Sequence, residues 1–127
     1  MIKWKRHIET GHHLFACKSF QEAKFHYQMA CKRAISLSFE LGNEQETVMA
    51  AVVSHHGLAQ LYTETGFSQL AQYEVEKLHY HLQSILDKED LTDERRTIFL
   101  YGLQRTHVLL LQYMKTSTSN GRLSAKV

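Results

Sequence analysis

The sequence predicts an all-α protein. There is no proline among its 127 residues, and proline is the residue that most strongly breaks a helix. Apolar residues recur at helical spacing over long windows, and few stretches alternate strictly between apolar and polar residues as strands do. A chain of this length is about one domain and can bury a core without disulfide or metal cross-links.

Five helices are expected from caps and periodicity. The segments SFQE at 19–22 and NEQE at 43–46 read as capping boxes that open two of them. Gly42 and Gly66 are suited to end the helices before them. Residues 116–127 lack a core-forming pattern and are expected to be a mobile tail, which leaves 1–115 as one domain. The expected helices are about 2–17, 19–41, 43–65, 67–87 and 93–115.

Small and aromatic residues in the first hairpin have the spacing of a known repeat. Gly11, Phe20, Ala23, Tyr27 and Ala30 resemble the tetratricopeptide (TPR) repeat, in which small residues lie where helices cross and aromatics wedge between them. A second, weaker match has Ala59, Tyr62, Gly66, Ala71 and Leu78 in the corresponding places. The resemblance implies antiparallel helical hairpins in a TPR-like, right-handed array.

The interval between the two matches departs from the family. Ala23 and Ala71 are 48 residues apart, whereas the usual period is about 34. The tryptophan, leucine and proline positions of the repeat are also incomplete. An irregular five-helix bundle without a groove is the alternative.

The resemblance also implies where a partner binds, because first helices of such hairpins line a concave face. Some members clamp the C-terminal carboxylate of a peptide with Lys and Asn at places that hold Ile8 and His12 here, which argues against that specificity. For every groove residue the alternative is core packing or plain solvation. The implied groove residues are Lys5, Ile8, His12 and Phe15 from the first helix, Val53, His56, Gln60 and Thr63 from the third, and Arg96, Phe99 and Leu103 from the fifth.

Residues that carry chemistry are present without a motif that uses them. No two of the nine histidines are three or four residues apart, which is the spacing that places two ligands on one helix face. Cys17 and Cys31 form no CxxC pair and are expected to be buried free thiols. No glycine-rich phosphate loop occurs. We therefore expect no catalytic activity, no metal and no cofactor.

Charge is segregated along the chain. Residues 1–38 carry seven Lys or Arg and two acids, residues 39–94 carry two and eleven, and residues 95–127 carry six and none, giving +5, −9 and +6. These blocks can attract one another within the fold or between copies, or the basic ones can attract an acidic partner. Nucleic-acid association through the basic residues is one alternative function, although no recognition helix is visible.

The segment from Ile98 to Met114 is more apolar than a helix packed on one side requires. Something is expected to cover its second face: another copy through Leu110 and Tyr113, the first hairpin, or a different protein. The charged N-terminal segment has no apolar stretch after it, so neither a secretory signal nor a membrane anchor is expected, and a cytoplasmic location is.

Taken together, these patterns predict a non-catalytic protein–protein interaction module, an adaptor or scaffold that binds a helix or an extended peptide in a groove. The alternatives are a nucleic-acid-associated regulator and a homo-oligomeric structural module. The sequence does not identify the partner.

Overall fold

The computed structural model describes residues 2–37, 44–88 and 90–125, with side chains for 2–36, 44–88 and 90–115. These residues form helices and no strand, which confirms the predicted all-α class. The five helices are α1 (Ile2–Ala16), α2 (Phe20–Leu37), α3 (Glu44–Glu64), α4 (Ser68–Lys88) and α5 (Asp93–Ala125).

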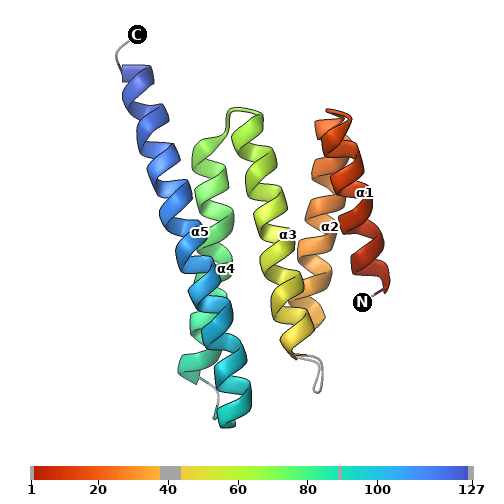
Figure 1. Cartoon of the computed structure of the whole chain (residues 1–127), viewed down its shortest axis with the longest axis vertical. Helices are drawn as coiled ribbons and strands as arrows, with labels where there is room; N and C mark the ends of the chain where they lie inside the picture. Colours follow the sequence, from red (N-terminus) through yellow and green to blue (C-terminus); the bar gives the residue numbers. More distant parts are fainter. Residues whose placement is uncertain (1, 38–43, 89, 126–127) are drawn as a thin grey trace.

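The helices form two layers, one with α1, α3 and α5 and the other with α2 and α4. Each helix packs against the next one in the chain, and α3 also contacts α1 and α5. In Figure 1, α1 and α5 pass in front of α2 and α4, and α3 lies between the two outer pairs. The helix α3 is apolar around most of its circumference, as expected for a helix with neighbours on several sides. One face of the molecule is therefore built from α1, α3 and α5.

The helix ends follow from local geometry. Gly66, with a φ of 89°, ends α3, and the Phe67 N–H donates to the Tyr62 carbonyl at 2.7 Å. This confirms the predicted helix end at Gly66. The loop after α1 uses the same turn with Lys18 at a φ of 61°. The predicted caps at Gly42 and Asn43 lie outside the described residues.

The helix α5 is longer than predicted. It runs to Ala125, ten residues past the predicted end at Lys115, so the predicted helix end is wrong, whereas the mobility of 116–127 stays a prediction. Once a helix exists, each further residue adds a backbone hydrogen bond at low cost, and no proline interrupts the segment.

The contact between α1, α2 and α3 is centred on Tyr27. A Cβ on Gly11 would lie 3.0 Å from the Tyr27 ring, and one on Gly57 would lie 2.7 Å from it. The ring therefore fills a slot that only glycine leaves open on both sides. The Tyr27 hydroxyl lies 2.7 Å from His12 Nδ1, and its side chain is among the most buried in the protein.

The residues predicted to pack at helix crossings mostly do so. Ala23, Ala30, Ala59 and Ala71 are fully buried, Tyr62 is buried, and Phe20 packs partly buried against the core. Gly66 is the exception: it is exposed, and a Cβ added to it would have no atom within 4 Å. Its role is the positive φ that ends α3, not packing. The resemblance to TPR arrays remains a prediction.

Candidate functional site

A stripe of side chains along α3 faces the side of the molecule shared by α1, α3 and α5. Its members recur every three or four residues, which places them on one side of the helix. Gln45 and Thr63 are 18 residues apart, five full turns, so they point in the same direction. We call this set the α3 stripe: Gln45, Met49, Val53, His56, Gln60 and Thr63.

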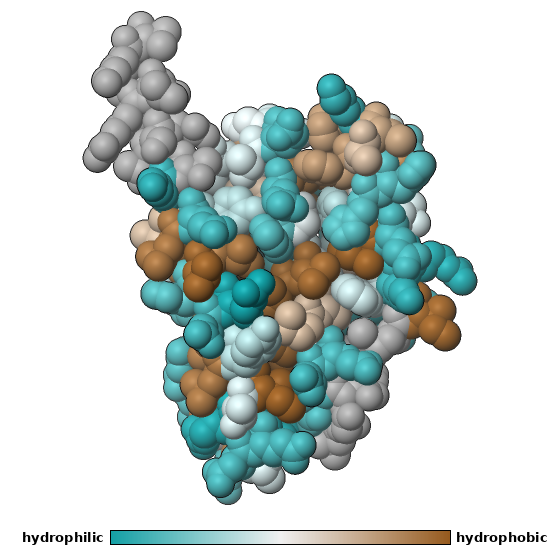
Figure 2. Space-filling model, in the orientation of Figure 1, coloured by the Kyte–Doolittle hydropathy of each residue, from teal (hydrophilic) through white to brown (hydrophobic). Residues whose placement is uncertain are grey.

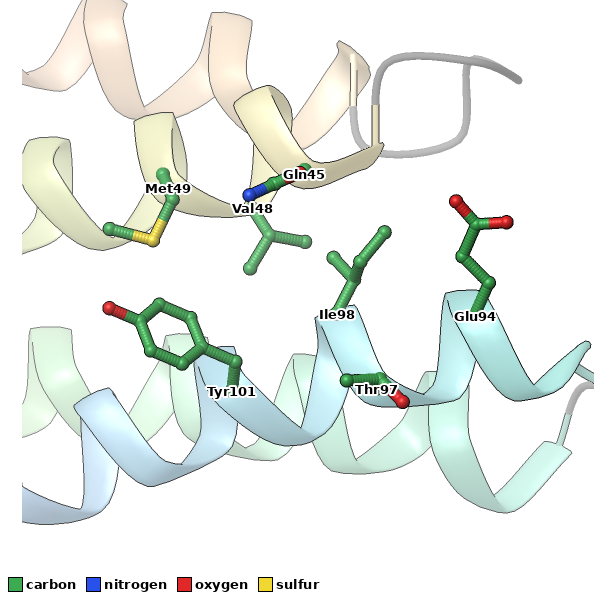
Figure 3. Close-up of a pocket in the computed structure, with 7 residues that line it drawn as sticks. All are labelled: Gln45, Val48, Met49, Glu94, Thr97, Ile98 and Tyr101. Carbon is green, nitrogen blue, oxygen red and sulfur yellow. The ribbon is translucent and has the colours of Figure 1, made fainter.

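One end of the α3 stripe borders a hollow between α3 and α5. It has a volume of about 610 Å³, within the range of roughly 300–1,000 Å³ typical of ligand pockets. Figure 3 shows Met49 and Tyr101 projecting into the gap between the two helices, with Ile98 and Val48 beside them. Gln45, Glu94 and Thr97 complete the lining. We call it the Met49 hollow.

The other end of the stripe borders a second hollow of about 320 Å³, where α1, α3 and α5 converge. Its apolar walls are Phe15 from α1 and Tyr113 from α5. The α3 side chains that line it are Gln60, Thr63 and Glu64. We call it the Phe15 hollow. It brings together residues from three helices that lie far apart in the sequence.

The two hollows lie along the same side of α3. Met49 and Gln60 are 11 residues apart, which is three turns or about 16 Å along the helix. His56 lies between them, and its ring contacts the Tyr113 ring with 6.0 Å between centroids. Figure 2, in the orientation of Figure 1, shows apolar side chains gathered over the middle of this face with polar side chains around them. We call the whole feature the α3 groove.

Charges alternate along the α3 groove. Glu94 lies at the Met49 hollow and Glu64 at the Phe15 hollow, and both side chains are exposed. Arg105, also exposed, lies near His56 between them. Burial, and then the charge of Arg105, lower the pKa of His56, so the imidazole is neutral near pH 7. The groove is negative, positive and negative from one hollow to the other.

Five of the predicted groove residues lie together in this groove. Phe15, Gln60 and Thr63 line the Phe15 hollow, His56 lies beside it, and Val53 is exposed on the same stripe. From the first helix, Lys5 and His12 are exposed, although His12 is held by its contact with the Tyr27 hydroxyl.

Four of the predicted groove residues do not line the groove. Ile8, Phe99 and Leu103 are core side chains, and Phe99 is 0 % exposed. Arg96 is exposed but lies two residues from Glu94 and Ile98, on another side of α5. The groove side of α5 is the row that contains Ile98, Tyr101 and Arg105. The predicted row is therefore shifted from the groove row by two residues, or roughly 160° around the helix.

The Met49 hollow was not predicted from the sequence. Its lining residues Gln45, Met49, Glu94 and Tyr101 had no predicted role. Part of the signal was available, because continuing the α3 stripe upstream from Val53 by helical steps reaches Met49 and Gln45. The α5 half carried no such signal, since the orientation of α5 depends on how Gly102 packs.

The helix α5 has a second exposed apolar row that the fold leaves uncovered. Leu100, Leu111 and Met114 are 51 %, 55 % and 43 % exposed. Among the described residues, neither α1 nor α2 packs against α5, so the first hairpin does not cover this row. The residues predicted for self-association were misplaced: Tyr113 is buried and Leu110 is half-buried against the core.

A third hollow, of about 390 Å³, lies where α2, α3 and α4 meet and contains Cys31, His55, Lys77 and His81. Burial lowers the pKa of both histidines and raises that of the Cys31 thiol. The thiol is therefore protonated and a poor nucleophile at neutral pH. Close by, the Lys77 ammonium lies 3.1 Å from Glu74 Oε1.

The cysteines and the possible metal ligands form no site among the described residues. Both cysteines are free thiols; Cys31 is buried as predicted, but Cys17 is exposed, at the end of α1 where the chain turns. Within 2–36, 44–88 and 90–115, no three His, Cys, Asp or Glu side chains converge as ligands for a metal ion. None of the helices in the described part of the chain is long and apolar enough to cross a membrane.

The described helices form an all-α protein with one elongated, partly apolar face along α3. The chain belongs to the family described as Protein of unknown function (DUF2753), whose model matches residues 2–127. No curated protein and no solved structure matches it.

Proposed function

We propose that this protein is a non-catalytic interaction module that binds a segment of another polypeptide in the α3 groove. The observation that carries the proposal is the pair of hollows on one side of α3. They total about 930 Å³ (610 and 320) and are joined by half-exposed side chains. Grooves of this kind, between helices, take the apolar side chains of a helix or an extended segment.

The chemistry of the groove favours binding over catalysis. The side chains of the two hollows that could transfer protons are Glu94, Glu64, Tyr101 and Tyr113. The two carboxylates lie in separate hollows, and burial raises the pKa of Tyr113 to about 12, so its hydroxyl stays protonated. A nucleophile beside a base, the arrangement that covalent catalysis needs, does not occur in the groove.

A nucleic-acid partner is less well supported. Among the basic residues that could contact phosphate, Arg95 is engaged inside the fold, where its Nε lies 3.0 Å from Glu44 Oε1. The side chain of Glu44 is buried. The remaining described basic residues are spread over α1, the turn after it, α2, α4 and α5. The α3 groove itself carries two carboxylates, which repel phosphate.

The test is selection of peptides with the native chain. A displayed library of random peptides is selected on the native protein, and the enriched clones are measured on two variants. Met49→Arg fills the Met49 hollow with a charge, whereas Leu70→Arg adds the same charge at an exposed position of α4. We expect clones that bind the Leu70 variant like the native chain and lose at least about tenfold in affinity on the Met49 variant.

Tyr101→Glu provides a second change in the groove at a half-exposed position, in case Met49→Arg lowers stability. Thermal melts followed by circular dichroism show whether each variant is folded. Clones that bind all variants equally, or a selection that enriches no peptide, would contradict a groove-binding function.

We propose self-association as a second candidate function, based on the uncovered row of α5. The row contains no Lys, Arg, Asp or Glu over its length, so two copies can pack along it without bringing such side chains of like charge together. A two-fold pair is the commonest way in which identical chains cover such a surface. Its members are Leu100, Gln104, His107, Leu111 and Met114.

Sedimentation equilibrium of the native chain tests this candidate. We expect the mass of a dimer for the native chain at tens of micromolar, and that of a monomer for Leu111→Glu. Phe25→Glu is the control, because Phe25 is equally exposed but lies on α2. A native monomer, or a dimer that Leu111→Glu leaves intact, rules out pairing through this row.

A further inference from the structure

Resting on the proposed function, we propose that the partner of the α3 groove is an amphipathic helix with a basic residue near each end of its apolar stripe and an acidic residue midway. The backbone of the groove gives the first reason. The groove walls are helices, whose backbone groups are already bonded within each helix. An extended peptide would find no free backbone edge there to pair with its own N–H and C=O groups. A helix satisfies these groups internally and offers a stripe of side chains instead.

The dimensions of the groove fit such a stripe. The Met49 and Phe15 hollows are separated by about three turns of α3, and side chains eleven residues apart on a partner helix would span the same distance on one face. Tyr101, Val53 and Val108 are between 37 % and 49 % exposed. They provide apolar contact beside and between the hollows.

The charges of the groove specify the polar part of the partner. Glu94 stands at one hollow and Glu64 at the other. Arg105 lies between them on α5, after Glu94 and eight residues before Tyr113 of the Phe15 hollow, and its charge acts on His56. His56 lies seven residues from both Met49 and Thr63. A partner with positive, negative and positive side chains in this order would match all three charges. The pattern is symmetric, so it holds for either direction of the bound helix.

Three synthetic peptides of about 18 residues, roughly 27 Å long as helices, test the inference. They share one stripe of leucines and differ only in the residues that flank it. One has lysines near the ends and glutamate in the middle, the second has these charges reversed, and the third has glutamine throughout. Fluorescence anisotropy measures the affinity of each peptide for the native full-length chain, at about 50 mM and about 500 mM salt, because salt screens exposed charges.

We expect the lysine-ended peptide to bind about tenfold more tightly than the charge-reversed one at low salt, since each exposed pair contributes only a few-fold. The difference should shrink at high salt. Glu94→Lys should reduce the ratio of the affinities of the lysine-ended and the charge-reversed peptides several-fold. Asp87→Lys makes the same change in net charge on α4, in the other layer, and should leave the preference unchanged.

The outcomes separate this inference from the proposed function. If all three peptides bind equally at both salt concentrations and Met49→Arg abolishes that binding, the groove binds helices but the charge pattern is overturned. If the charge-reversed peptide binds more tightly than the lysine-ended one, the proposed charge pattern is also overturned. If none of the peptides binds, both the inference and helix binding by the groove are overturned, while selected peptides of other conformation would still support the broader function.

Discussion

At the scale of single residues, the absence of a side chain matters as much as its presence. Tyr27 fits between α1 and α3 because Gly11 and Gly57 leave room for its ring. The same holds for Gly102, where a Cβ would lie 2.6 Å from Val48 Cγ1. Close packing makes such slots sensitive to a single methyl group. The Trp4 indole N–H adds a polar tie between α1 and α3, donating to Ser54 Oγ at 2.6 Å.

Gly57→Ala is predicted to destabilise the fold through Tyr27. The added methyl group meets the ring at 2.7 Å, and overpacking of this kind costs about 1–3 kcal/mol. In a Tyr27→Ala background the collision is gone, and the same change should stabilise the helix by up to about 1 kcal/mol. Chemical denaturation of the four proteins of this cycle measures both effects. Equal effects of Gly57→Ala in the two backgrounds would show that the ring is not the cause.

Ala23→Leu is predicted to cost about 1–3 kcal/mol, because Ala23 is fully buried between helices. Ala16→Leu is the matched control, since Ala16 is exposed at the end of α1. Lys24→Leu is less suitable, because the Lys24 ammonium lies 5.8 Å from the centroid of the Tyr62 ring and its side chain is half-buried. Coincident denaturation midpoints for the two leucine variants would argue against close packing at Ala23.

At the scale of the helices, the sequence predicts where they begin and end better than how they are turned. Caps and periodicity are local signals, and four of the five helices end within a few residues of their predicted limits. The rotation of α5 is a tertiary property. It is set where Gly102 lies against Val48 and Leu82, and this contact buries Phe99 and turns Ile98 and Tyr101 towards the α3 groove. No pattern within 93–115 alone distinguishes these rows, because nearly all sides of that segment are apolar.

The turn after α1 should gain stability from a glycine. Lys18 holds a φ of 61°, a conformation that costs an ordinary residue about 1–2 kcal/mol. Lys18→Gly is therefore expected to stabilise the fold by about 1 kcal/mol. The greater conformational freedom of glycine in the unfolded chain reduces this gain. Lys18→Ala removes the charge but keeps the Cβ, and should not stabilise in this way. Urea denaturation compares the variants; a gain of equal size from alanine would assign the effect to charge.

At the scale of the whole molecule, the layered arrangement decides which predicted features meet. Sequence spacing predicted the α3 half of the groove, since its residues share one helix. The junction of Phe15 with Tyr113 across three helices could not be predicted, because it depends on how α1 and α5 are placed on either side of α3. The same arrangement leaves the outer row of α5 exposed and encloses His55 beneath α2 and α4.

The stability of the whole fold is predicted to fall as the pH drops below about 6.5. His55 is buried, and its Nδ1 lies 2.8 Å from the Ala51 carbonyl oxygen. Burial is the largest effect and lowers the pKa of His55 below its ordinary value of 6.5. The hydrogen bond to Ala51 and the charge of Glu74 raise this pKa by less, and the charges of Lys77 and His81 lower it further. In this window the unfolded chain binds more protons than the folded one, so the free energy of unfolding decreases with decreasing pH.

Between pH 6.5 and the lowered pKa of His55, this residue reduces the free energy of unfolding by up to about 1.4 kcal/mol for each pH unit. This is the effect of one proton bound by the unfolded chain and not by the folded one. His55→Gln cannot be protonated, so its free energy of unfolding should depend less steeply on pH between about 6.5 and 5. His13→Gln, which replaces an exposed histidine by the same residue, is the control for the substitution itself. Urea titrations at several pH values measure these slopes. Because burial also lowers the pKa of His56, His79 and His81, some dependence on pH should persist in the His55 variant. A slope identical to that of the native chain would show that folding does not lower the pKa of His55.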